Sequence, residues 1–171
     1  MMKDDVRFSI AILLLLVALG ATISRTQIIW PEPPEEVAFQ SYHRRYVTAR
    51  GEEDGWALRQ DTDLGPCGWF TQHHLANGKV ALETCHGLYV TARESCNTRQ
   101  ACMLGQESRL GECGQFDLYE LGENRVALKT CAGAGNFLTA ADGGWPPPSE
   151  WSIVGYTDVM LEWEIFTVRR P

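Results

Sequence analysis

The sequence has few of the features that mark metal-binding or nucleic-acid-binding proteins. It contains four histidines, no C-x-x-C pair and no basic run, and 22 acidic residues outnumber 15 basic ones to give a net charge of −7. Surfaces that follow phosphates need clustered Lys and Arg, so the composition argues against nucleic acid as a partner. Zinc sites need Cys and His at close, regular spacing, and we expect neither a metal ion nor another cofactor.

A convincing catalytic set is also missing. An enzyme needs a nucleophile, an acid or a base held in a shaped pocket. His73 and His74 precede an Asn-Gly turn, and Asp61 and Asp63 lie two residues apart. Without further groups nearby, both pairs are typical of solvated turns. We therefore expect a protein that is not an enzyme, and we keep His73 and His74 only as candidate ligand contacts.

Long apolar runs are absent except near the N-terminus. Residues 8–24 are seventeen uncharged positions, rich in Leu, Ile, Val and Ala. As a helix they would span roughly 25 Å, slightly less than the ~30 Å hydrocarbon core of a bilayer. Residues 1–24 predict a cleaved signal peptide or a retained membrane anchor, and the Pro- and Glu-rich residues 25–36 predict a linker. In both cases the following domain is expected to be secreted or membrane-anchored, on the extracytoplasmic or lumenal side.

The rest of the chain repeats itself three times. The copies read VAFQSYHRRYVTAR, VALETCHGLYVTAR and VALKTCAGAGNFLTA, and they begin at Val37, Val80 and Val126. Further residues of the first copy recur forty-six positions later in the second: Leu58, Gln60, Leu64, Gly65, Cys67, Gly68 and Phe70. Such regular self-similarity predicts one domain, 37–171, built from three units. These units are 37–79, 80–125 and 126–171.

Within each unit the residue spacing indicates β-strands. Val80 and Leu82 lie two apart, which places their side chains on one face of a strand, and the tripeptides YVT and FLT favour the same structure. Asn77-Gly78, between two such runs, is typical of a hairpin turn. Three units of about four strands are too few for a propeller, which needs at least about four blades. We therefore predict an all-β fold, a single β-trefoil of three four-strand repeats.

Two longer stretches carry a family resemblance. NGKVALETCHGLYVTA and ENRVALKTCAGAGNFLTA resemble the opening strands of the fascin-like β-trefoils, which include fascin and hisactophilin, and FDLYEL and EIFTV resemble the closing strand of that group. The resemblance covers about residues 37–168 and implies a β-trefoil fold and actin binding or bundling. Fascin, however, has four such domains in tandem, and the dense histidines of hisactophilin are missing here.

All six cysteines lie in the repeated part of the chain, and four of them follow the repeat. Cys67 and Cys85 are eighteen residues apart, as are Cys113 and Cys131, and each pair brackets a predicted hairpin. The predicted disulfides are Cys67–Cys85, Cys113–Cys131 and Cys96–Cys102, among the fifteen pairings that six cysteines allow. An even cysteine count after a signal-like segment favours an oxidising compartment. The alternative is a cytosolic domain with buried free thiols.

Tryptophans supply the other candidate ligand contacts, because aromatic faces give sugars and peptides a large contact area at low entropic cost. Trp145 lies in GGWPPPSEW, where three prolines favour an exposed loop. We select Trp56, Trp145 and Trp151, and we expect Trp163, beside the last strand, to pack in the interior. The ricin-type Q-x-W sugar signature is absent. Three segments depart from the repeat and are candidate functional loops: 94–102, 132–136 and 142–151.

These features predict a non-enzymatic, secreted or membrane-tethered binding or scaffolding module for a protein or glycan ligand. One alternative is a fascin-like actin-binding or bundling protein, which would be cytosolic and carry free thiols. Another is an accessory subunit of a membrane assembly, which would retain residues 8–24 and reach the membrane through them. The sequence leaves the oligomeric state open.

Overall fold

The computed structural model contains β-strands and four one-turn 3-10 helices in the part of the chain that it describes. The described residues are 32–93, 102–130, 136–142 and 151–171. The predicted signal or anchor, residues 1–24, lies outside them. No helix among the described residues is long and apolar enough to cross a membrane. The all-β prediction is confirmed.

Each repeat contributes four strands. Repeat 1 contains β1 (Glu35–Gln40), β2 (Tyr46–Ala49), β3 (Leu58–Asp61) and β4 (Trp69–His74). Repeat 2 contains β5 (Val80–Glu83), β6 (Tyr89–Ala92), β7 (Cys102–Glu107) and β8 (Asp117–Glu120). Repeat 3 contains β9 (Arg125–Lys129), β10 (Phe137–Ala140), β11 (Ile153–Thr157) and β12 (Phe166–Arg169). The 3-10 helices are η1 (Glu52–Asp54), η2 (Pro66–Gly68), η3 (Glu112–Gly114) and η4 (Glu162–Glu164).

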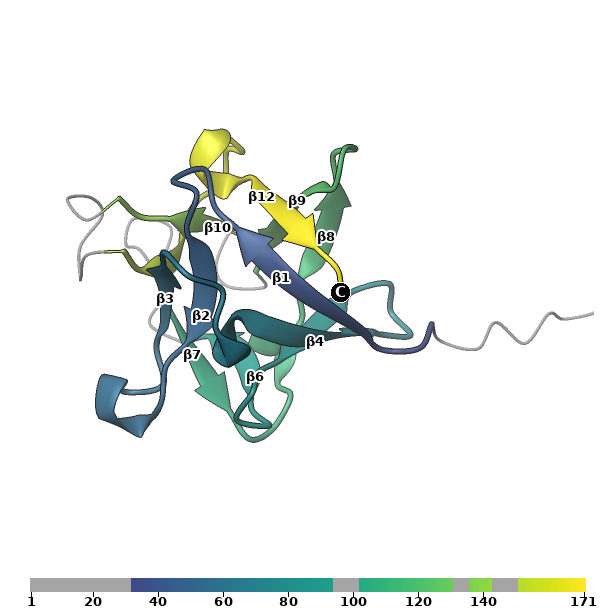
Figure 1. Ribbon diagram of the computed structural model, residues 1–171. Coiled ribbons are helices and arrows are strands. Elements are labelled where there is room, and N and C mark those ends of the chain that lie inside the picture. Colours follow the sequence, from purple (N-terminus) through teal and green to yellow (C-terminus); the bar gives the residue numbers. More distant parts are fainter. Residues whose placement is uncertain (1–31, 94–101, 131–135, 143–150) are drawn as a thin grey trace, which may run out of the picture. The chain divides into compact units, whose positions relative to one another are not determined.

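Six of these strands close into a barrel. Antiparallel ladders join β1 to β4, β4 to β5, β8 to β9, β9 to β12 and β12 back to β1. The bridge between Val80 and Phe116 joins β5 to β8 and completes the ring. Figure 1 shows β12 running beside β1 to the C-terminus, so the last strand of repeat 3 pairs with the first strand of repeat 1.

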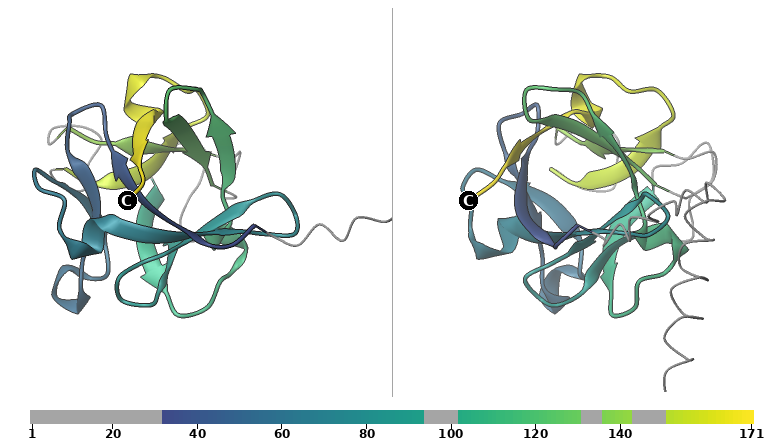
Figure 2. Two further views of the ribbon diagram at one scale, coloured as in Figure 1. Left: turned by 45° about the vertical axis from the view of Figure 1, so that its right-hand side comes forward. Right: turned by 90° about the vertical axis from the view of Figure 1, so that its right-hand side faces the viewer.

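The other six strands form three hairpins. These are β2–β3, β6–β7 and β10–β11. The hairpins also contact one another, because β11 pairs with β7 and Arg59 of β3 bridges to Ser152 beside β11. Figure 2 shows this arrangement from two further directions. A six-stranded barrel with a triplet of hairpins is the strand pairing of a β-trefoil, as the repeats predicted.

The core follows the threefold repeat. Two sets of equivalent residues fill the barrel, all of them buried: Phe70, Phe116 and Phe166, and Phe39, Leu82 and Leu128. The Phe39 ring lies 5.9 Å from that of Phe70 and 6.3 Å from that of Phe166. Each such side chain stabilises the fold by roughly 1.5–3 kcal/mol when removed from water. No single repeat could bury these residues alone.

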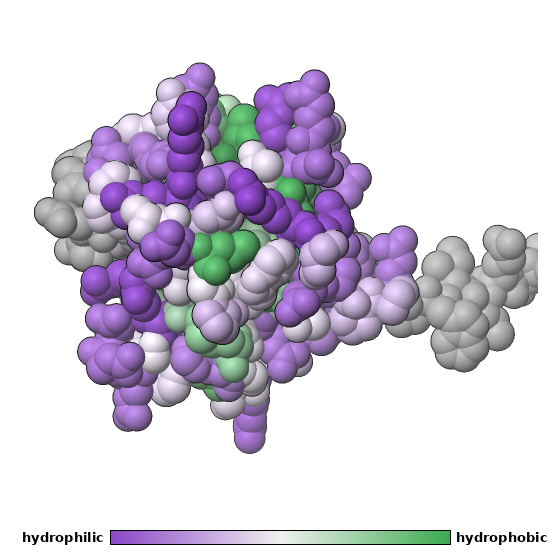
Figure 3. All heavy atoms as spheres, viewed as in Figure 1, coloured by the Kyte–Doolittle hydropathy of each residue, from purple (hydrophilic) through white to green (hydrophobic). Residues whose placement is uncertain are grey.

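Local sequence explains the β4–β5 hairpin. Gly78 has φ of 80°, a left-handed conformation that glycine adopts without strain. The side-chain oxygen of Asn77 accepts a hydrogen bond of 3.1 Å from the backbone N–H of Lys79. The structure begins β1 at Glu35, so the last two residues assigned to the linker belong to the first strand. Figure 3 shows that the face carrying β1 is largely hydrophilic, with small separate apolar areas.

Candidate ligand-binding site

A disulfide closes the seam where repeat 1 meets repeat 2. Cys67 in η2 is bonded to Cys85 in the β5–β6 turn, with 5.0 Å between their Cα atoms, and this is the pairing that the spacing predicted. Cys102 and Cys113 each take part in a disulfide as well, with partners outside the described residues. Cys96 and Cys131 lie outside the described residues, so the Cys96–Cys102 and Cys113–Cys131 pairings stay predictions.

The same seam holds the one group of described residues with metal-ligand spacing. The ligand atoms of Cys67, Cys85 and His86 lie within 4.8 Å of one another. Both sulfur atoms, however, are used in the disulfide. Cysteine binds a metal ion as the thiolate, so this group does not offer a metal site in the oxidised protein.

Aromatic residues occupy the corresponding seam between repeats 3 and 1. Alignment of the repeats places Trp163 where repeats 1 and 2 have Cys67 and Cys113, and Tyr42 where repeat 2 has Cys85. The ring of His43 lies 5.4 Å from that of Trp163 and 5.6 Å from that of Tyr42. Repeats 3 and 1 thus meet through ring contacts, whereas repeats 1 and 2 are joined at the equivalent seam by a disulfide.

Trp151 extends this group, and the four residues Tyr42, His43, Trp151 and Trp163 form what we term the aromatic seam. The rings of Trp151 and His43 are 5.8 Å apart in an edge-to-face arrangement. The His43 imidazole is also held by the backbone, since its Nε2 lies 3.0 Å from the Ala140 carbonyl oxygen and donates to it in the matching tautomer. Such aromatic pairs contribute roughly 0.5–1.5 kcal/mol each.

Trp56 is the counterpart of Trp151 in repeat 1. Trp56 precedes the buried Leu58 of β3 by two residues, and Trp151 precedes the buried Ile153 of β11 by two. Both tryptophans have a left-handed backbone, with φ of 57° and 59°. The Trp56 ring lies 5.4 Å from that of His86, as Trp151 lies against His43. The Trp–His pair is therefore part of the repeat, and it occurs once beside a disulfide and once beside an open aromatic seam.

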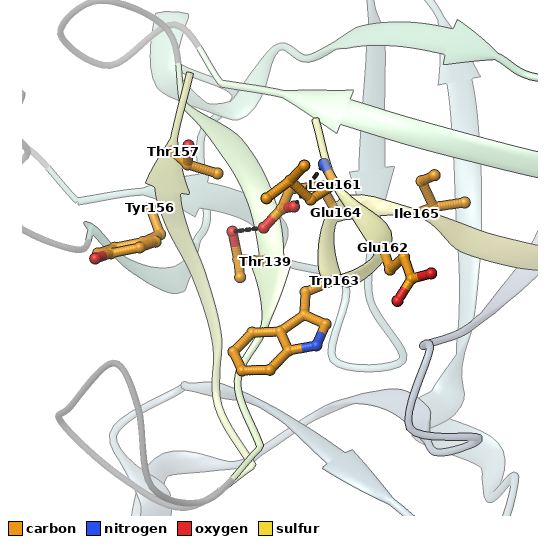
Figure 4. Close-up of a pocket in the computed structure, with 8 residues that line it drawn as sticks. All are labelled: Thr139, Tyr156, Thr157, Leu161, Glu162, Trp163, Glu164 and Ile165. Atoms are coloured by element: carbon orange, nitrogen blue, oxygen red, sulfur yellow. Dashed lines mark hydrogen bonds between the residues drawn. The ribbon is translucent and has the colours of Figure 1, made fainter. Parts of the chain in front are cut away.

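A groove of about 730 Å³ opens beside Trp163 (Figure 4). It lies between the β10–β11 hairpin and η4. Its lining is mostly apolar and comprises Thr139, Tyr156, Thr157, Leu161, Glu162, Trp163, Glu164 and Ile165. A cavity of this size with a few polar groups is the usual form of a small-ligand site.

A buried carboxylate fixes the floor of the groove. Glu164 is only 3% exposed, and its two oxygens accept hydrogen bonds from the Thr139 hydroxyl (2.8 Å) and the Leu161 backbone N–H (2.9 Å). These bonds offset the cost of burying the carboxylate. In Figure 4 the rings of Tyr156 and Trp163 lie on different sides of the Thr139–Glu164 bond. The two hydrogen bonds therefore fix the Glu164 side chain in the lining of the groove.

Tyr156 owes its position to a β-bulge. Along the β10–β11 ladder, Leu138 is opposite Gly155 but Phe137 is opposite Thr157, so Tyr156 is the extra residue of the bulge. The equivalent hairpins β2–β3 and β6–β7 have an unbroken register. Bulges often redirect a side chain near a functional site. Here the bulge places a 38% exposed tyrosine at the groove.

The hollow at the equivalent place in repeat 2 has a different character. It measures about 530 Å³, and charged side chains line much of it: Arg93, Glu107, Arg109 and Glu112. Cys113 takes the place of Trp163 there. The hollow of repeat 3 therefore differs from that of repeat 2 in its aromatic lining.

The predicted ligand contacts fall in different places. Trp151 is part of the aromatic seam, whereas Trp56 lies at the disulfide seam. His73 and His74 lie on β4, where the imidazole of His73 is 2.8 Å from a Glu83 carboxylate oxygen and that of His74 is 3.7 Å from a Glu35 oxygen. Trp145 lies outside the described residues, as do most positions of the three candidate loops.

The interior position predicted for Trp163 is wrong. Trp163 is half-buried and lines the groove, because it belongs to η4 at the barrel rim and Phe166, three residues later, fills the core. Sequence reasoning did not identify four further lining residues, which are Tyr156, Thr157, Leu161 and Glu162. The signal that could have revealed the groove is the tryptophan that stands at a cysteine position of the repeat.

Comparisons with known proteins give structural matches alone. No family model and no curated protein matches the sequence. The designed threefold-symmetric protein ThreeFoil superposes with a TM-score of 0.67 at 15% identity, covering 80% of this chain and 99% of that one. SeviL bound to the asialo-GM1 saccharide gives a TM-score of 0.60 at 9% identity, over 81% of this chain and 98% of that one.

A third match is part of an enzyme. The exo-β-1,3-galactanase 1,3Gal43A from Clostridium thermocellum has a TM-score of 0.68 at 11% identity, and the match covers 82% of this chain but only 31% of the galactanase. Because the sequence identities are 15% or lower, these superpositions show that the fold is a β-trefoil and do not show membership of a family. Membership of the fascin-like group stays a prediction.

Proposed function

We propose that this chain is a non-enzymatic binding module that holds a glycan in the groove of repeat 3. The observation that carries the proposal is a groove of about 730 Å³ whose lining includes the exposed Tyr156, the half-buried Trp163 and the hydrogen-bonded carboxylate of Glu164. Sugar rings have apolar C–H faces that pack on aromatic rings, and their hydroxyls need hydrogen-bonding partners. The groove offers both.

The polar groups of the groove suit sugar hydroxyls. Glu162 is exposed and can accept two hydrogen bonds, and the hydroxyl of Thr157 can both donate and accept. Glu164 is already engaged with Thr139 and Leu161, so it shapes the site without binding the ligand. A few directed polar groups beside aromatic faces distinguish a glycan site from a purely apolar docking surface.

The structural neighbours support this choice among ligands. One is described in complex with the asialo-GM1 saccharide, and another is a galactanase, so β-trefoils of similar shape occur in proteins that handle sugars. The oxidised cysteines support an extracytoplasmic location, because disulfides persist in secreted and surface proteins. We propose that the module is secreted or membrane-tethered and meets its glycan there.

A glycan array tests the proposal. The full chain is applied beside the variant Trp163→Ala, and Trp56→Ala serves as the matched control because it removes an equivalent class of ring at the disulfide seam. We expect Trp163→Ala to weaken binding of the selected glycans at least roughly tenfold, in line with the loss of a central aromatic contact. Trp56→Ala should keep the affinity of the unmodified protein.

Two outcomes would reject the proposal. One is a failure of the unmodified protein to bind any glycan on the array. The other is an equal loss of affinity in Trp56→Ala and Trp163→Ala while both variants retain the unmodified protein's circular dichroism spectrum.

A further inference from the structure

The turn between β1 and β2 carries two arginines beside the aromatic seam. The backbone N–H of Ser41 donates to the carbonyl of Arg45 over 2.8 Å, and that of Arg44 donates to the carbonyl of Ser41 over 2.9 Å. This tight turn presents Tyr42, which is 55% exposed, and the exposed Arg44. A cationic and aromatic tip therefore lies at the end of the seam.

Arg44 occupies a position that disfavours it. Its φ is 60°, and the equivalent residue in repeat 2 is Gly87, with φ of 68°. Glycine takes this left-handed conformation freely, whereas a residue with a Cβ is strained in it. Residues held in strained conformations cluster at functional sites. Arg44 therefore stands where the equivalent turn of repeat 2 has an unstrained glycine.

Arg45 is oriented by the aromatic seam. Its guanidinium carbon lies 3.8 Å from the centre of the Trp151 ring. Trp151 contacts His43, and His43 contacts Trp163 at the groove. Stacking on an aromatic face holds the guanidinium plane and leaves its N–H donors at the edge available to a ligand. A continuous strip of rings therefore links Arg45, the neighbour of Arg44, to the groove.

The charges of Arg44 and Arg45 are not compensated by described carboxylates. Five other cationic residues form ion pairs with acidic side chains: Arg50, Arg59, Lys79, Arg125 and Arg170. Neither Arg44 nor Arg45 forms an ion pair with any described residue. In a protein of net charge −7, two adjacent unpaired arginines make a local positive surface.

We infer that the ligand is an acidic glycan, with a neutral sugar in the groove and a carboxylate or sulfate on Arg44 and Arg45. This inference rests on the proposed function and adds the ligand class. The charges set the orientation, because Glu162 at the groove repels an anion and favours hydroxyls, whereas the guanidinium groups bind carboxylate or sulfate in two-point contacts. The ligand spans the aromatic seam between these ends.

Matched glycan pairs test the inference. The probes are 3′-sialyllactose against lactose, together with sulfated and unsulfated pairs on the array. We expect the acidic member to bind at least roughly tenfold more tightly at low salt, and the difference to shrink as NaCl is added. The double variant Arg44→Gln/Arg45→Gln should lose this preference and still bind the neutral member.

Two further variants separate charge from folding. Arg109→Gln/Arg125→Gln removes the same charge elsewhere and should keep the preference. Arg44→Gly restores the residue type of repeat 2, so it should fold at least as well as the unmodified protein and still weaken binding of the acidic member.

The outcomes are distinct. Equal affinity for acidic and neutral members would overturn the inference and leave the proposed function standing, whereas no binding of either member across the array would overturn the proposed function. Loss of the preference in the Arg109→Gln/Arg125→Gln control would overturn the inference, as would a polyglutamate peptide that competes as strongly as the acidic glycan.

Discussion

The seams between repeats 1 and 2 and between repeats 3 and 1 occupy equivalent positions and are closed in different ways. The first is closed by the Cys67–Cys85 disulfide and by chain continuity through the β4–β5 hairpin. No disulfide between described residues joins the second, and the β1–β12 ladder and the aromatic seam hold it together. A disulfide joins two small side chains, so at the first seam the Trp56–His86 pair lies beside the closure and takes no part in it. Aromatic closure leaves large rings at the surface, where a ligand can reach them.

Removing the disulfide gives the largest expected effect. In Cys67→Ser/Cys85→Ser the chain loses a covalent loop that spans a sequence separation of 18. The free energy of unfolding should fall by about 3 kcal/mol, because the unfolded chain regains conformational freedom. Urea denaturation without reductant measures this change. Glycan affinity should stay the same, and a large loss of affinity would show that the two seams are not independent.

Installing a disulfide at the aromatic seam reverses the comparison. Tyr42→Cys/Trp163→Cys places cysteines at the positions equivalent to Cys85 and Cys67. We expect the new pair to oxidise, to stabilise the fold by about 2 kcal/mol, and to abolish glycan binding. Intact mass with and without reduction, together with urea denaturation, detects the bond. The single variants are the controls, and two free thiols in the double variant would contradict the equivalence of the seams.

The smallest expected effect comes from the ion pair of Glu35 and Arg170, at the seam between repeats 3 and 1. Arg170 Nε donates a 2.9 Å hydrogen bond to Glu35, and this bond, aided by the charges of Arg170 and His74, lowers the pKa of Glu35 from its ordinary value of 4.5. A lowered folded-state pKa stabilises the protein above about pH 4.5, and this contribution is lost as the pH falls through the folded-state pKa.

Glu35→Gln should therefore flatten the dependence of stability on pH below about 4.5. The side chains of Glu35 and Arg170 are partly exposed, at 32% and 47%. The free energy of unfolding of the variant should therefore differ from that of the unmodified protein by less than about 1 kcal/mol. Thermal unfolding of both proteins between pH 3 and pH 7 measures it. An identical pH dependence in the variant would show that the pair contributes nothing to closing this seam.

The symmetric part of the molecule was predictable from sequence, because the repeat itself encodes it. A residue such as Phe70 recurs as Phe116 and again as Phe166, since each repeat must fill the same barrel. The cysteine spacing likewise placed Cys67 beside Cys85. Repetition in sequence becomes repetition in space when the units share one core.

The candidate site was not predictable in the same way, because it lies where the repeat breaks. Tyr156 reaches the groove through a one-residue bulge that appears only in the strand register. Trp163 could be assigned to the interior or to the rim, since three residues separate it from the core residue Phe166. Side-chain exposure at a barrel rim depends on packing between distant segments, and local residue patterns do not report it.

The central claim is that a ligand binds at the aromatic seam and its groove, and indole N–H signals in a proton–nitrogen NMR spectrum test it most directly. The signals are assigned by single Trp→Phe variants, and the unmodified protein is titrated with the glycan selected on the array. We predict that the signals of Trp163 and Trp151 shift on binding while those of Trp56 and Trp69 stay in place. Shifts at Trp56 or Trp69, with Trp163 unchanged, would contradict the account.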